Sequence, residues 1–336
     1  MRSFLIRYTG ICLLTVLCFG SQAQTETEDI YQLAQESGNL GFDQLLDQVD
    51  ARLDDKTDIA LFFYYWLARH IEYDTAPRAT PFETPLDHEA AEPLNVFTLR
   101  KATCTGFTNL YNAFLTYFEI PHQTVIGYSK HQQNLLKRAK PALDHAWSAI
   151  WLNDRWHLVE TTWANLYIDT PNMRDHYFMT PPDQMIVDHL PAEEQWQLTE
   201  RLMNLEEFTT QTYVDAKYFA YARQASLLPG LNKGEEGHLV LTTSVMPGWK
   251  LSLQLVDANN EPVKKLKYKA KRSKESFLFQ LKNYEPGYTL RLDASKAFID
   301  GREITMPGIA YLNEETIQST GSVRYASTIS KPERKR

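Results

Sequence analysis

The chain has 336 residues, of which 43% are hydrophobic and 23% are charged, and its formal net charge at pH 7 is −7. A net negative charge argues against non-specific binding to nucleic acid, which requires a basic surface. A chain of this length can bury a substantial hydrophobic core and is long enough for about two domains.

The first 23 residues have the order of a secretory signal peptide. Arg2 and Arg7 supply a positive start, residues 11–19 form a short apolar run, and residues 21–23 form a small-x-small cleavage pattern. The apolar run is too short to span a bilayer. No other apolar stretch of the sequence approaches the length that a membrane-spanning helix needs. We therefore expect a secreted or periplasmic protein that is not embedded in a membrane. A buried N-terminal helix is the alternative interpretation.

Cleavage of this segment would leave one of the three cysteines. Cys12 and Cys18 lie inside the segment, whereas Cys104 lies outside it, and loss of Arg2 and Arg7 changes the net charge from −7 to −9. A single cysteine excludes an intrachain disulfide. In an exported protein it indicates an intermolecular bridge or a free reactive thiol.

The first two thirds of the chain mix helical and extended patterns. Residues 25–56 are predicted to form polar, amphipathic helix, and apolar residues over 57–74 recur at helical spacing, with Thr57 or Asp58 as the cap. The segments that follow are a proline-rich loop over 75–93, a helix beginning near Cys104, a strand over 122–129, a basic connection over 130–140, a hairpin over 145–163, an irregular segment over 171–191 and further helices over 192–228.

From residue 238 onward, short alternating segments are separated by turn signals such as Asn259-Asn260 and Asp300-Gly301. This pattern predicts a small β-sandwich. The basic run over 263–275 is typical of a solvated edge strand, and a site for a glycan or an acidic partner is the alternative. The basic tail over 326–336 is expected to be disordered.

Cys104 stands at the predicted start of a helix. The apolar residues after it share one helical face: Phe107, Leu110, Tyr111, Phe114, Leu115 and Phe118. With Thr103 as the N-cap, Cys104 takes the first helical position, where unpaired amides and the helix dipole favour a thiolate. Gly106 would allow another backbone or a substrate to approach closely. A small buried hydrophobic residue is the alternative role for the cysteine.

The hairpin over 145–163 can bring a histidine and a carboxylate together. A two-residue turn at 153–154 sets His145 opposite Thr162, and the alternation of side chains then puts Glu160 on the same face, as a diagonal neighbour of His145. His157 falls on the other face. This is the arrangement of a base and the acid that orients it, although an ordinary polar cross-strand pair is the alternative.

Three motifs resemble the transglutaminase-like superfamily: Cys-Thr-Gly-Phe at 104–107, His-Ala-Trp at 145–147 and Trp-His-Leu-Val-Glu-Thr-Thr-Trp at 156–163. Residues 175–198 resemble the segment that follows this core in the kyphoscoliosis-peptidase branch. The resemblance spans roughly residues 60 to 200. It implies an α+β, papain-like core, with Cys104 as the nucleophile, His145 as general base and acid, and Glu160 as the orienting carboxylate.

The resemblance also implies a reaction. The thiolate attacks a carboxamide or peptide carbonyl of a protein or peptide substrate, and water or an amine resolves the thioester, as in a peptidase, a deamidase or an amide acyl-transferase. No cofactor or metal is expected. The other histidines show no spacing typical of a zinc site; they are His70, His88, His122, His131, His176, His189 and His238.

Three residues depart from the family pattern: Glu160 replaces the usual Asp, Ser148 a frequent Asn and Ala102 a frequent Gly. The alternative function is therefore a catalytically degenerate binding or scaffold protein. The predicted domains are a signal peptide over 1–23, a transglutaminase-like domain over 24–234, a β-sandwich over 235–325 and the tail.

Overall fold

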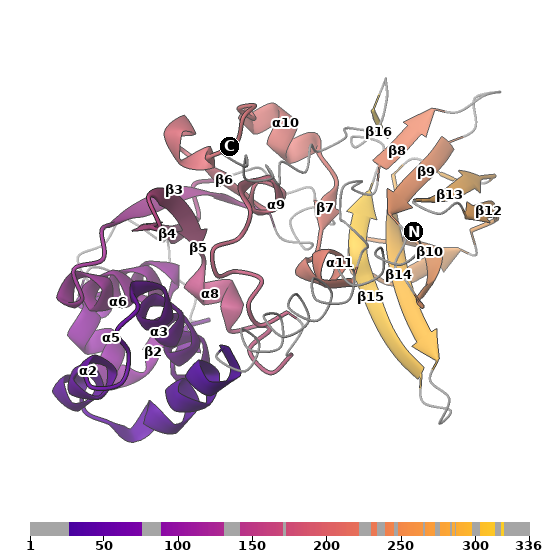
Figure 1. Cartoon of the computed structure of the whole chain (residues 1–336). Helices are drawn as coiled ribbons and strands as arrows, with labels where there is room; N and C mark the ends of the chain where they lie inside the picture. The colour runs from indigo at the N-terminus through magenta and orange to yellow at the C-terminus, as the bar shows by residue number, and fades with distance from the viewer. Residues whose placement is uncertain are drawn as a thin grey trace, which may run out of the picture. The chain divides into compact units, whose positions relative to one another are not determined.

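The computed structural model in Figure 1 describes residues 27–75, 89–130, 142–170, 173–221, 230–233, 239–244, 248–264, 266–272, 276–282, 284–285, 287–297, 303–312 and 317–318. The chain divides into two compact units, one of Met1–Thr124 with Ala146–Phe178 and one of Val125–His145 with Met179–Arg336. The predicted signal peptide and basic tail lie outside the described residues, as do most of the predicted loop over 75–93 and most of the basic connection.

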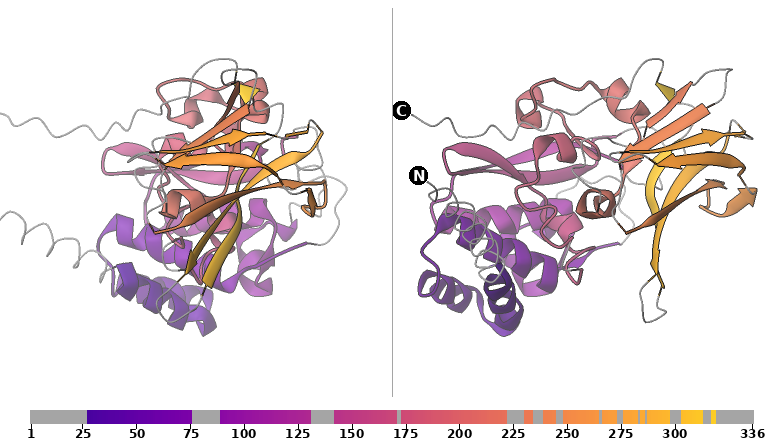
Figure 2. Two further views of the ribbon diagram at one scale, coloured as in Figure 1. Left: turned by 90° about the vertical axis from the view of Figure 1, so that its right-hand side faces the viewer. Right: turned by 45° about the vertical axis from the view of Figure 1, so that its right-hand side comes forward.

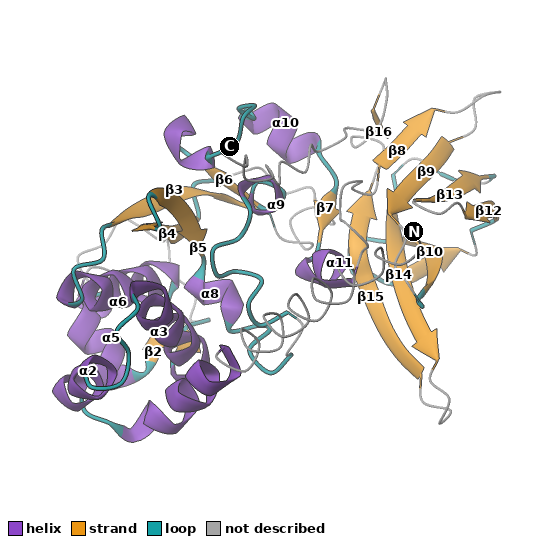
Figure 3. Cartoon of the chain, in the orientation of Figure 1, coloured by secondary structure: helices purple, strands orange, loops and turns teal. Residues whose placement is uncertain are grey.

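The first unit is mainly helical (Figure 3). Residues 27–36 are helical and are followed by η1 (Ser37–Asn39), α2 (Phe42–Asp50), α3 (Lys56–His70), β1 (Glu72–Tyr73), α5 (Pro93–Leu99), β2 (Lys101–Ala102), α6 (Cys104–Tyr117) and later α8 (Thr161–Ala164). Strands β1 and β2 pair in parallel. The cap predicted for α3 is wrong: Asp55 accepts the N–H groups of Thr57 (2.7 Å) and Asp58 (3.3 Å). An extended aspartate just before a helix reaches these two amides directly.

Helix α3 is the centre of the first unit. Its residues 59–68 are all buried, so the helix is packed on every side and not on one face alone. Phe63 stacks on Phe114 of α6, with ring centroids 4.1 Å apart, and Trp66 stacks on Phe97 of α5 at 5.2 Å. These contacts hold α6, and with it Cys104, against the core.

A four-stranded sheet has the order β5-β4-β3-β6. Its strands are β3 (His122–Ser129), β4 (His145–Leu152), β5 (Arg155–Val159) and β6 (His189–Pro191). The hairpin register is confirmed, because Leu152 pairs with Arg155 and the turn residues 153 and 154 both have positive φ, of 50° and 60°. The pairing of His145 with Thr162 is wrong, since the ladder ends at Val159 and Thr162 belongs to α8.

The second unit continues with α9 (Pro182–Met185), η2 (Glu194–Gln197), α10 (Leu205–Thr210), β7 (Tyr213–Val214) and α11 (Ala216–Tyr221). Two five-stranded sheets follow, in the orders β11-β10-β14-β15-β7 and β12-β13-β9-β8-β16. The remaining strands are β8 (Gly230–Lys233), β9 (Leu239–Ser244), β10 (Lys250–Val256), β11 (Pro262–Lys264), β12 (Tyr268–Arg272), β13 (Ser276–Leu281), β14 (Thr289–Ala297), β15 (Glu303–Leu312) and β16 (Ile317–Gln318).

The two sheets, drawn as ribbons in Figure 2, share one hydrophobic core. Leu241 and Phe279 contribute to it from one sheet, and Leu255 and Leu292 from the other, all of them buried. The α+β class with all-β sheets after it is thus confirmed. The domain boundary at 234/235 stays a prediction, although β7 and β8, which precede it, pair with strands that follow it.

The basic run over 263–275, predicted as one edge strand, is divided between β11 and β12 in different sheets; β12 is the outermost strand of its sheet, as predicted. Residues 269–272 are exposed on both of its faces, so that the lysines are solvated.

Among the described residues, no helix combines the length and the apolar character needed to cross a membrane.

Candidate active site

Cys104 is the first residue of α6 and follows Thr103 as the N-cap residue, as predicted. Among the described residues, the Thr103 side chain forms no capping hydrogen bond, and the first helical bond runs from the Phe107 N–H to the Thr103 carbonyl at 3.0 Å. The amides of the first turn are therefore not used within the helix and concentrate positive potential at its start. The Cys104 side chain lies in this field and is 3% exposed.

Gly106 fixes the start of α6 against its neighbours. A Cβ at this position would lie 2.7 Å from the Cβ of Ala102 and 2.9 Å from the Cγ2 of Val96. Only a glycine allows this approach, and the groups that approach are side chains, whereas the prediction named a backbone or a substrate. The helix start is therefore held closely against α5 and β2.

Two hydrogen bonds tie α6 to the beginning of β4. The Thr108 Oγ1 donates to the Ala146 carbonyl (3.1 Å), and the Ser148 Oγ donates to the Asn112 Oδ1 (2.8 Å). Asn112 in turn donates to the Thr124 Oγ1 of β3 at 2.9 Å. Ser148, which stands where the family often has Asn, thus keeps a polar contact with the helix that carries the cysteine.

Glu160 is fully buried at the end of β5 and is the N-cap of α8. Its Oε1 accepts the Thr162 N–H at 2.8 Å, and its Oε2 accepts the Trp163 N–H. These charge-assisted bonds offset the cost of burying the carboxylate. This capping role was not predicted from the sequence, because glutamate is not among the preferred N-cap residues.

The charge of the Glu160 carboxylate also affects the pKa of the buried Tyr64 hydroxyl. Burial, together with the charges of Tyr65, Asp175 and Glu160, raises the pKa of Tyr64 well above its usual range. Tyr64 therefore stays neutral, and its hydroxyl donates to the Arg174 carbonyl at 2.7 Å.

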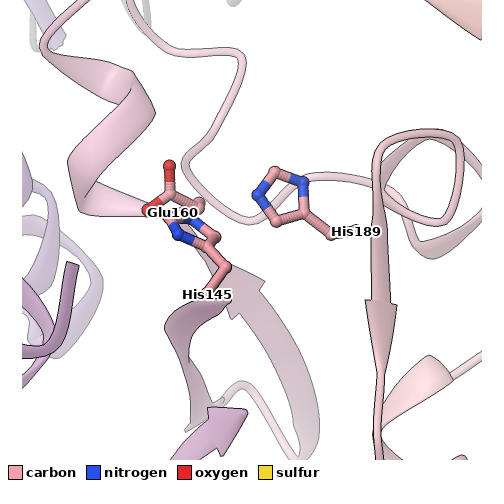
Figure 4. Close-up of side chains that lie close together, drawn as sticks. All are labelled: His145, Glu160 and His189. Carbon is pink, nitrogen blue, oxygen red and sulfur yellow. The ribbon is translucent and has the colours of Figure 1, made fainter. Parts of the chain in front are cut away.

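His145 is the first residue of β4 and is 4% exposed. Its ring lies beside that of His189 in β6, with the ring centroids 5.1 Å apart (Figure 4). His189 is fully buried, and its Nδ1 lies 2.6 Å from the Asp188 Oδ1. The place of His189 was not predicted from the sequence, because β6 reaches β3 only through long-range pairing.

His157 lies on β5 and accepts a hydrogen bond at Nε2 from the Arg155 Nε (3.2 Å). Burial and the Arg155 charge lower the pKa of His157. Because the Arg155 guanidinium donates to its Nε2, His157 is not suited to act as a general base.

The three predicted catalytic residues divide between the two units. Cys104 and Glu160 belong to the first unit, and His145 is the last residue of a segment of the second. Their assembly into a triad stays a prediction. His145, Glu160 and His189, drawn in Figure 4, are of residue types that can bind metals, and we assign no metal to them.

Replacement of Glu160 by glutamine is expected to lower the free energy of unfolding by about 1–3 kcal/mol, because the amide nitrogen would face backbone N–H groups. Glu160→Asp should lose less, since aspartate keeps the charge and is a preferred N-cap residue. Chemical denaturation of the two variants measures the difference. Equal stability of Glu160→Gln and the unmodified protein would show that the carboxylate does not hold α8.

Comparison with known proteins gives a match to one family model and to several curated proteins. The model of the transglutaminase-like superfamily matches residues 43–161. Kyphoscoliosis peptidase of Homo sapiens is 29% identical over 205 residues, which are 58% of this chain and 30% of that protein. The Mus musculus kyphoscoliosis peptidase is 30% identical over 165 residues, covering 46% of this chain and 24% of its own length.

Hillarin of Drosophila melanogaster is 25% identical over 147 residues, which are 38% of this chain and 17% of that protein. The chain therefore spans less than a third of the length of the curated relatives it matches.

Proposed function

Since the chain carries a transglutaminase-like domain over residues 43–161 and resembles the kyphoscoliosis peptidases, we propose that it is a thiol enzyme acting on peptide or glutamine side-chain amides. Cys104 is the nucleophile, His145 the general base and acid, and Glu160 the carboxylate that orients His145. The name of the relatives favours peptide bonds as substrates, while deamidation and acyl transfer share the same first step.

The observation that carries the proposal is the match in spacing between α6 and β4. Thr108 and Asn112 lie four residues apart on the helix, about 6 Å, and contact Ala146 and Ser148, two residues and about 6.6 Å apart on the strand. The two contact positions are therefore about equally far apart on the helix and on the strand. Cys104 lies one turn before Thr108, and His145 immediately precedes Ala146, so both residues lie just beyond the first of these contacts in the sequence.

The hairpin register supports the role of Glu160. The ladder pairs Ser148 with Val159 and ends there, so Glu160 directly follows the last paired residue of β5, and Trp147 directly precedes its partner. His145 is two residues before Trp147 and therefore projects from the same face of β4. Each carboxylate oxygen of Glu160 accepts one backbone N–H and retains a second lone pair, so capping α8 and orienting an imidazole are compatible.

The proposed reaction has two steps. His145 takes the thiol proton, the Cys104 Sγ attacks the carbonyl carbon, and the proton passes to the leaving ammonia or amine as the thioester forms. Water or an amine, deprotonated by His145, then attacks the thioester and releases the thiol. The backbone N–H of Cys104, at the start of α6, would donate to the oxyanion.

A catalytically degenerate scaffold is the second candidate. The observation that favours it is the engagement of both Glu160 oxygens by α8, together with the burial of Cys104. In that case Glu160 would serve only to cap α8, and Cys104 only to pack the start of α6.

We also propose export of the protein, on the basis of the order of charged, apolar and small residues over 1–23.

The pH dependence of Cys104 alkylation by iodoacetamide tests the proposal. After removal of residues 1–23 no other thiol is present in the sequence. For an enzyme, the rate should reach half of its maximum well below about pH 8.5, the pKa of an ordinary cysteine. A half-maximum at or above that pH would favour the scaffold.

A further inference from the structure

A second buried carboxylate–imidazole pair lies beside His145. His189 is fully buried, Asp188 is 4% exposed, and the Nδ1 of the histidine lies 2.6 Å from the Oδ1 of the aspartate. The ring centroids of His145 and His189 are 5.1 Å apart, with their planes inclined at 45°. The reaction described above does not use this pair.

Backbone hydrogen bonds fix the Asp188–His189 pair in place. His189 pairs with Ser129 in the β3–β6 ladder, and the backbone N–H of Lys130 donates to the Asp188 carbonyl at 2.8 Å. The buried Lys130 side chain continues to the end of α10, where its Nζ donates to the Phe208 (3.0 Å) and Thr209 (3.2 Å) carbonyls. A cation at a helix C-terminus is favourable, so this anchor is stable.

The Asp188 carboxylate determines which ring nitrogen of His189 carries the proton. An ionised Asp188 can only accept, so the Nδ1 of His189 carries the hydrogen and the Nε2 of the neutral ring is an acceptor. In that state the pair has one negative charge. Because both rings are almost completely removed from water, this charge acts on His145 with little screening.

We propose that His189, fixed by Asp188, is a positioning residue that holds the His145 ring and stabilises its protonated form. The inference rests on the proposed function, because it gives His145 the role of the base. When the Cys104 proton moves to His145, the negative charge of the pair offsets the new positive charge. The proton itself stays on His145 until it passes to the leaving group, so no proton is transferred to His189.

Other charged groups surround the pair. Lys130 directs its charge to the carbonyls of α10. Asp144 precedes His145 and accepts the Ser129 N–H (2.8 Å) and hydroxyl (3.0 Å). Glu160 is the acid that the proposed function assigns to His145. Asp188 therefore has to be varied separately from these two acids.

Asp188→Asn tests the charge alone, because the asparagine carbonyl still accepts the Nδ1–H of His189. Its effect is read in two ways: by NMR titration of the His145 ring, and by the pH of half-maximal Cys104 alkylation. We expect His145 to lose its proton about one pH unit lower and the alkylation half-maximum to rise by a similar amount. Asp188→Glu should restore both values, at least in part.

His189→Gln tests the ring, since glutamine can still donate to Asp188 but supplies no imidazole beside His145. His157→Gln is the matched control, a buried histidine of the same sheet that is engaged by Arg155. Circular dichroism establishes that each variant is folded. If the His145 titration is the same in Asp188→Asn and in the unmodified protein, the inference is overturned.

The two proposals fail in different ways. A His145 titration that follows the charge at position 188 supports the inference whatever the reactivity of the thiol. An ordinary alkylation half-maximum for Cys104 in the unmodified protein, with His145 still responding to Asp188→Asn, overturns the proposed function alone.

Discussion

Replacement of Cys104 by alanine is expected to abolish turnover of peptide and glutamine amides, with a loss of at least about 10³-fold. The reason is that no other group in the proposed site can form the thioester. A mixture of peptides serves as the substrate, and mass spectrometry of the products detects cleavage, deamidation or incorporation of an added amine. Each of these reactions requires the same acyl-enzyme.

The fold should persist in this variant. The substitution removes one sulfur atom from the buried start of α6, a change that costs on the order of 1 kcal/mol, while the Gly106 contacts that position the helix remain. Denaturant unfolding of Cys104→Ala and of Cys104→Ser provides the control. Turnover that survives in a folded Cys104→Ala variant would rule out the thiol mechanism.

Replacement of His145 by glutamine is expected to lower turnover by about 10²- to 10⁴-fold, the usual contribution of a general base. Without the imidazole, the thiolate also loses its cationic partner, so the half-maximum of Cys104 alkylation should move up to the value of an ordinary cysteine. The measurement combines the peptide assay with the alkylation profile.

The comparison with His157→Gln separates a catalytic loss from a loss of packing. Both histidines are buried and both lie on the hairpin strands β4 and β5. If the two variants lose turnover equally, the effect comes from the sheet and not from a base at position 145.

Local sequence signals predicted the parts of the site that depend on neighbouring residues. The Asn153-Asp154 turn fixed the β4–β5 register, because both residues adopt positive φ and the strands then pair residue by residue. Thr103 in an extended conformation placed Cys104 at the first helical position. Neither inference required knowledge of the tertiary structure.

The predictions that were wrong or missing concern residues whose positions depend on tertiary structure. The alternation over 155–163 looks like one strand, but Glu160 accepts two backbone amides and starts α8 instead. His189 gave no signal at all, since its place beside His145 comes from the pairing of β6 with β3 across some sixty residues of chain. The α3 cap differed because Asp55 precedes the apolar pattern from which the helix was predicted.

The burial of α3 on every side bears on the local unfolding of α6, the helix that begins at Cys104. An isolated helix of about 15 residues is marginal in water, so we expect α3 to become ordered together with α5 and α6, whose rings stack on it. Detaching α6 would expose Phe63 and Phe114 at once. The amides of α6 should therefore exchange with solvent only through unfolding of the whole unit, which makes the start of this helix as persistent as the unit itself.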